Sequence, residues 1–82
     1  MNYPLVKIDW KDSRQPSSEW KWLEDFEPTG AVTCTSVGWL IHDDKDVKVL
    51  AQNLGDTSEE NKQASGIIQI PACSVFKITP LT

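Results

Sequence analysis

The chain has 82 residues, of which 39% are hydrophobic and 24% charged, with four Gly and five Pro. This length and composition predict one domain over residues 1–82 and exclude a disordered, collagen-like or membrane-spanning chain. The formal net charge is −4 and no cluster of Lys and Arg is visible, so nucleic acid is an unfavoured partner.

The first element that we expect in chain order is a strand over residues 5–10. From Val6 onward, apolar and polar residues alternate, with Val6, Ile8 and Trp10 on one face. This is the period of a half-buried strand. A polar loop that contains Pro16 follows it.

The pattern changes in segment 18–26. Its large apolar side chains recur at helical spacing: Trp20, Trp22, Leu23 and Phe26. The pattern predicts a short helix with Ser17 or Ser18 as N-cap, and Pro28 ends it because proline disfavours helix at the preceding residue. Two Trp also suit a strand, so this alternative stays open.

Four further strands are predicted by runs of apolar and β-branched residues, at 31–41, 47–54, 67–70 and 75–79. Imperfect alternation near 36–38 indicates a bulge or a sharp bend in the first of these strands. The expected connections are a polar hairpin turn at 42–46, a polar loop at 55–66 and a tight turn at 71–74.

These elements are too few and too short for a large sandwich. We therefore expect a mainly β fold, a small five-stranded barrel with one short helix between strands 1 and 2, because closure removes free edges. The order of elements, with a single 3₁₀ turn in 71–74 before the last strand, resembles an SH3-like or Sm-like barrel.

Three stretches of the chain, residues 36–44, 49–54 and 68–78, resemble small accessory proteins of tailed bacteriophages. The resemblance covers roughly the last two-thirds of the chain and concerns the fold rather than chemistry. It implies no catalytic residue. It does imply a role, since phage proteins of this size are often inhibitors of host defence or of host enzymes.

Residues suited to catalysis are sparse. The only His, His42, lies beside an acidic turn, where we expect a solvated residue rather than a base held against a nucleophile. Asp43, Asp44 and Asp46 lack the Gly and the distal Glu of a calcium loop. The sequence therefore predicts a protein that is not an enzyme and that takes no cofactor and no metal.

Two cysteines, Cys34 and Cys73, show neither the spacing of a metal site nor that of a disulfide scaffold. We expect reduced thiols. The first residues, Met1 to Pro4, show no basic n-region and no apolar h-region. The expected location is therefore the cytoplasm, which is the host cytoplasm if the protein is phage-encoded, with no membrane partner.

Four Trp are unusual in so small a chain. Trp10 and Trp39 lie on strand patterns and are most simply core residues. On a helix, Trp20 and Trp22 would point roughly 200° apart, so one should face outward. That indole either covers an open end of the barrel or contacts a partner subunit, a purine base or a target protein. The candidate binding residues are Trp20, Trp22, Trp39, Arg14, His42 and Lys77.

Acidic residues surround this Trp pair, and residues 16–30 carry a net charge of −3. They form either the solvated side of a helix or a recognition surface for a basic partner. Our first hypothesis is a homo-oligomer that sequesters a nucleotide-type defence signal between subunits. The alternative is an acidic inhibitor that blocks a host or defence enzyme. An RNA-binding Sm-like role ranks third, and an enzyme last.

Overall fold

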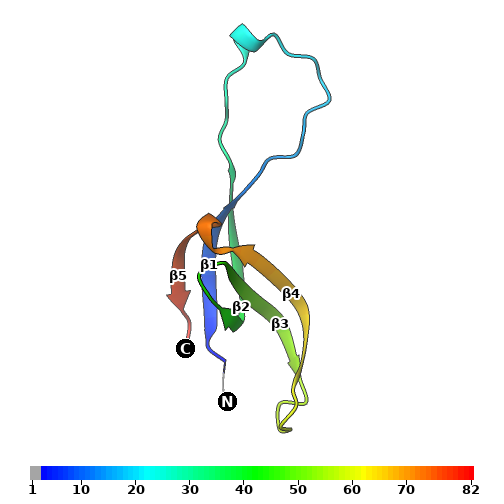
Figure 1. Cartoon of the computed structure of the whole chain (residues 1–82), viewed down its shortest axis with the longest axis vertical. Helices are drawn as coiled ribbons and strands as arrows, with labels where there is room; N and C mark the ends of the chain where they lie inside the picture. Colours follow the sequence, from blue (N-terminus) through cyan, green and yellow to red (C-terminus); the bar gives the residue numbers. More distant parts are fainter. Residues whose placement is uncertain (1–2) are drawn as a thin grey trace.

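The computed structural model describes residues 3–82, so Met1 and Asn2 lie outside the described part of the predicted single domain. Five antiparallel strands form one sheet in the order β4-β3-β2-β1-β5, which confirms a mainly β fold (Figure 1). The strands are β1 Leu5–Asp12, β2 Val32–Asp43, β3 Val47–Gly55, β4 Gln63–Pro71 and β5 Val75–Pro80. Two 3₁₀ turns, η1 Leu23–Asp25 and η2 Ala72–Ser74, complete the fold.

The two ends of the sheet are β4 and β5, and no pairing joins them in the described part of the chain. Closure into a barrel is therefore not confirmed. The predicted 3₁₀ turn is confirmed, because η2 links these two strands. The N–H of Ala72 in this turn donates to the carbonyl of Asp46 at 2.9 Å, which ties η2 to the β2–β3 turn.

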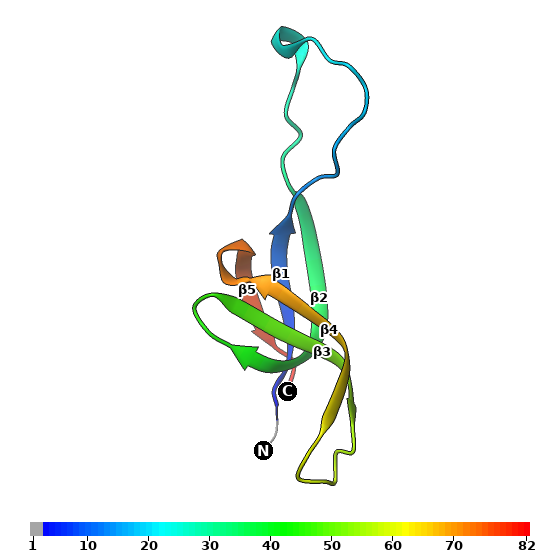
Figure 2. The same ribbon diagram turned by 45° about the vertical axis from the view of Figure 1, so that its right-hand side comes forward.

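The long strand β2 lies in the middle of the sheet and pairs with both β1 and β3. It pairs with β1 up to Trp39 and with β3 from Trp39 onward, and it curves between them (Figure 2). Gly38 stands at this change of partner. A Cβ at Gly38 would lie 2.7 Å from the carbonyl oxygen of Ala51, so the close approach requires glycine.

Two sequence predictions for the sheet need adjustment. Of the bulge or sharp bend predicted at 36–38, the bulge lies later, where the register of β2 against β3 shifts between Leu40 and His42. The bend agrees with the curve of β2 at its change of partner near Gly38 (Figure 2). Strand β4 begins at Gln63 instead of Ile67, because the polar segment before Ile67 pairs with the end of β3 through its backbone.

The core lies between the curved halves of the sheet. Its buried cluster consists of Val6, Ile8, Leu50 and Ile70, with Trp10, Leu40, Ile68, Val75 and Ile78 packed against it. The indole N–H of Trp10 donates to the Ser36 hydroxyl at 3.0 Å, which satisfies the polar end of a partly buried Trp. Cys34 and Cys73 are free thiols.

The helix predicted over 18–26 is wrong, since only the single turn η1 forms there. Residues 13–31, which we call the arm, leave the end of β1, project away from the sheet and return to β2 (Figures 1 and 2). A helix of nine residues needs a core to pack its apolar stripe, and a projecting segment has none. Within residues 3–82, no helix is long and apolar enough to cross a membrane.

Candidate functional site

The base of the arm is closed by one long-range hydrogen bond. The Arg14 Nε donates to the carbonyl of Gly30 at 2.7 Å. Gly30 has a φ of +84°, a left-handed conformation that glycine adopts without strain. Arg14, one of the predicted binding residues, therefore holds the two ends of the arm together.

The large apolar side chains of the arm are exposed to solvent. Trp20 is fully exposed, Trp22 is 80% exposed, Leu23 91% and Phe26 56%. Both Trp are exposed, so the expectation that only one of them faces outward is wrong. Exposed apolar clusters mark interaction sites, and a structureless connection of this length inside a small domain is usually functional or disordered.

Trp20 and Trp22 line one hollow together with Lys21. The backbone at Trp22 is extended, with φ −69° and ψ 128°. In extended chain, residues two apart lie on the same side, whereas on a helix they diverge. The loss of the predicted helix therefore brings the two indoles to one site instead of separating them.

The arm is acidic around these indoles. The Nζ of Lys21 donates to the carboxylate of Glu19 at 3.1 Å, and both side chains are exposed. Glu24 and Asp25 lie in η1, and Glu27 follows it. Because Glu19 offsets the charge of Lys21, the arm presents a negative field to an approaching partner.

The other predicted binding residues lie on the sheet, apart from the arm. Trp39 is half-buried on β2, opposite Leu5 and Ala51. Lys77 is exposed on β5, opposite Asp9. His42 is exposed at the end of β2. Of the six predicted residues, the structure thus gathers Trp20 and Trp22 at one hollow and sets Arg14 at the base of the same arm.

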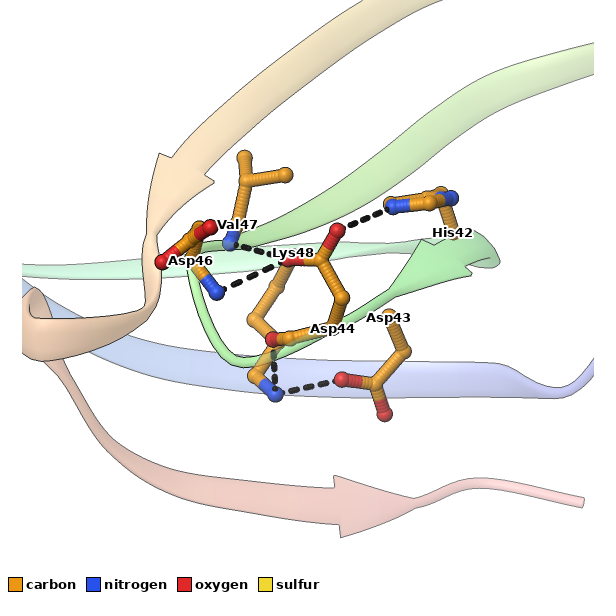
Figure 3. A network of polar contacts seen from close by, with 6 residues as sticks. All are labelled: His42, Asp43, Asp44, Asp46, Val47 and Lys48. Atoms are coloured by element: carbon orange, nitrogen blue, oxygen red, sulfur yellow. Dashed lines mark hydrogen bonds and ion pairs between the residues drawn. The ribbon is translucent and has the colours of Figure 1, made fainter.

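The acidic turn between β2 and β3 forms a compact polar network (Figure 3). The carboxylate of Asp44 accepts hydrogen bonds from His42 Nε2 at 2.7 Å and from the N–H groups of Asp46 and Val47, both at 2.8 Å. The His42 bond, followed by the two backbone bonds, lowers the pKa of Asp44 from 3.8 to about 2. Asp44 therefore shapes the turn.

Lys48 completes this network. Its Nζ donates to the carboxylate of Asp43 and, at 2.9 Å, to the carbonyl of Asp44. The carboxylates of Asp43 and Asp44 are thus engaged by donors of the same hairpin. In the part of the chain that the structure describes, no group of three or more His, Cys, Asp or Glu is arranged to hold a metal ion.

Sequence reasoning missed the exposure of Leu23 and Phe26, because a helix would have packed them. One signal in the sequence favoured an arm over a helix, because Pro16 and Pro28 flank the segment. No family model, curated protein or solved structure matches the chain. The site is therefore defined by its geometry.

Proposed function

We propose that this protein is a non-catalytic binding protein whose arm occupies a basic site on a host or defence enzyme and blocks it. One observation carries the proposal: the large apolar side chains of the acidic arm are exposed to solvent, namely Trp20, Trp22, Leu23 and Phe26. Exposed Trp residues are typical anchors of protein interfaces. Their acidic surroundings favour a basic partner and repel an acidic one.

The scaffold supports this role. The strand order and η2 favour an SH3-like or Sm-like barrel, in which a rigid sheet carries variable loops. The resemblance to small phage accessory proteins is part of this proposal, and it makes a host or defence enzyme the class of target. The single His lies in an exposed turn and bonds Asp44, a setting that does not shield a substrate from water.

A second candidate is the sequestration of a nucleotide-type small molecule by a homo-oligomer. The hollow between Trp20 and Trp22 favours it, because indoles stack well on bases. The charge of the arm opposes it, since Glu19 offsets Lys21 and the phosphates need cations from elsewhere. Arg14 and Lys77 are the residues we assign to that role. For this reason the protein target ranks first.

Capture from a bacterial host lysate tests both candidates. Immobilised wild type is compared with Trp20→Ser/Trp22→Ser and with Leu81→Ser, which removes an exposed apolar side chain outside the arm. We expect one host protein, identified by proteomics, to be retained by the wild type and Leu81→Ser but lost from the double variant. Equal retention on all three would contradict a role for the arm.

The same eluates are analysed by small-molecule mass spectrometry. A nucleotide that co-elutes with wild type but not with Trp20→Ser/Trp22→Ser would favour sequestration. A thermal shift series with ATP, NAD and cyclic dinucleotides separates the candidates further. A ligand that prefers the native state raises its melting temperature, so sequestration predicts a rise and enzyme blocking predicts none.

A further inference from the structure

A second surface of the molecule has the opposite charge to the arm. Val6 and Ile8 of β1 are buried, so the alternation of the strand directs Lys7, Asp9 and Lys11 to the other face. Lys77 of β5 lies opposite Asp9. Three lysines against one aspartate give this surface a net charge of +2.

The same surface carries an exposed aromatic ring. Between the residues of β5 that pair with Asp9 and Trp10, the register shifts and leaves Phe76 as an extra residue. Phe76 is 56% exposed, and the Nζ of Lys11 lies 6.0 Å from the centre of its ring. We call Lys7, Asp9, Lys11, Phe76 and Lys77 the β1–β5 face.

The arm does not cover the β1–β5 face of its own chain. It continues from the end of β1 along the long axis of a molecule that measures 59 × 23 × 20 Å (Figure 2). Each chain therefore carries an unpartnered acidic arm with large apolar side chains and, separately, a basic face with an exposed ring. In a two-fold pair of chains, any contact of one arm with the other chain's face is repeated reciprocally.

We propose that the arm of one chain docks on the β1–β5 face of a second copy, and reciprocally, to form a homodimer. This inference rests on the chemistry of the proposed function, in which the arm recognises a basic and partly apolar surface, so a second copy and the enzyme compete for the same arm. The net charge of −3 on residues 16–30 meets the net charge of +2 on the face. Trp20, Trp22 and Phe26 supply the apolar contact.

The area available is sufficient for a stable pair. A fully exposed Trp or Phe side chain buries roughly 150–250 Å². Scaled by their exposed fractions, Trp20, Trp22 and Phe26 of two arms bury roughly 700–1,200 Å². The covered parts of the two faces add to this value. Stable specific interfaces bury about 1,200–2,000 Å² in total, so two reciprocal arm contacts reach the required size.

A charge swap tests the dimer. The arm variant is Glu24→Lys/Glu27→Lys and the face variant is Lys11→Glu/Lys77→Glu, and all four positions are exposed. Sedimentation velocity at tens of micromolar should show the wild type at about twice the 9.2 kDa of one chain. Each variant alone should sediment as a monomer, because its arm and its face then carry the same sign.

An equimolar mixture of the two variants should restore the dimer, because both contacts become complementary again. Circular dichroism confirms that each variant is folded. A monomeric wild type, variants that dimerise as tightly as the wild type, or a mixture that stays monomeric would each overturn the inference. A monomeric wild type that still retains a host protein through Trp20 and Trp22 would leave the proposed function standing.

Discussion

The arm should be dispensable for folding, and a short-hairpin variant tests this directly. Asp12 and Val32 pair in register at the end of the β1–β2 ladder. Replacing the 19 residues from 13 to 31 between them with Asn-Gly leaves a two-residue connection. Such connections form type I′ turns, whose twist matches that of the flanking strands.

The expected gain in stability follows from loop closure. The entropic cost of closing a flexible loop grows as (3/2)RT ln n, so shortening the connection from 19 residues to a stiff two-residue turn stabilises the fold by at most about 2 kcal/mol. The deletion removes few interactions that stabilise the folded state. The Arg14–Gly30 hydrogen bond lies within the arm, and the apolar side chains of the arm pack on no core residue.

Urea denaturation followed by circular dichroism measures the effect, at a concentration at which both proteins are monomeric. Ile70→Ala is the control, because Ile70 is fully buried and its truncation should cost about 2–5 kcal/mol in either background. A short-hairpin variant that is less stable than the full chain would refute the reasoning, since the arm would then pack on the sheet.

Three further predictions concern the sheet and its turn. Gly38→Ala should lower the free energy of unfolding by about 1–3 kcal/mol, because its Cβ would lie 2.7 Å from the backbone oxygen of Ala51; an unchanged urea midpoint would argue against so close an approach. Thr79→Val should leave stability unchanged or raise it by about 1 kcal/mol, since the buried Thr79 hydroxyl has no partner in residues 3–82; a clear loss would mean that the hydroxyl is bonded. Asp44 has its pKa lowered to about 2, first by its bond from His42, so its contribution to stability is present above its ordinary value of 3.8 and is lost as the pH falls through about 2. Urea midpoints measured from pH 5 to pH 2 should therefore fall less steeply for Asp44→Asn than for the wild type, and parallel curves would count against this role.

Strand prediction worked where one face of a strand meets the core. Val6 and Ile8 alternate with polar residues and are both buried, as their spacing predicts. In β3, Val49, Leu50 and Ala51 are all buried, and alternation does not predict this. Leu50 belongs to the core cluster with Val6, Ile8 and Ile70, a set of contacts between residues distant in sequence.

The arm shows where local patterns are insufficient. The spacing of Trp20, Leu23 and Phe26 suits a helix, but helices of this length depend on a core that receives the apolar stripe. That core is a tertiary property, and the arm lies beyond it. The sequence identified the Trp pair and its acidic surroundings, whereas the shared hollow of Trp20 and Trp22 depends on extended backbone.

The β1–β5 face was not predicted as a site for a similar reason. Lys11 and Lys77 are 66 positions apart, and only the pairing of β1 with β5 brings them to one surface. The sequence suggests Lys77 as a cation for a small molecule, but it does not show which residues surround it. The exposure of Phe76 depends on a register shift that the residue types do not predict.

The central claim is that the arm is the contact surface, and fluorine NMR of the chain labelled with 5-fluorotryptophan tests it most directly. The four Trp give four signals, assigned through single Trp→Phe variants. On addition of the captured host protein, or at tens of micromolar chain for self-association, the signals of Trp20 and Trp22 should shift while those of Trp10 and Trp39 stay. Signals of Trp20 and Trp22 that keep their solvent-exposed positions under both conditions would contradict the claim.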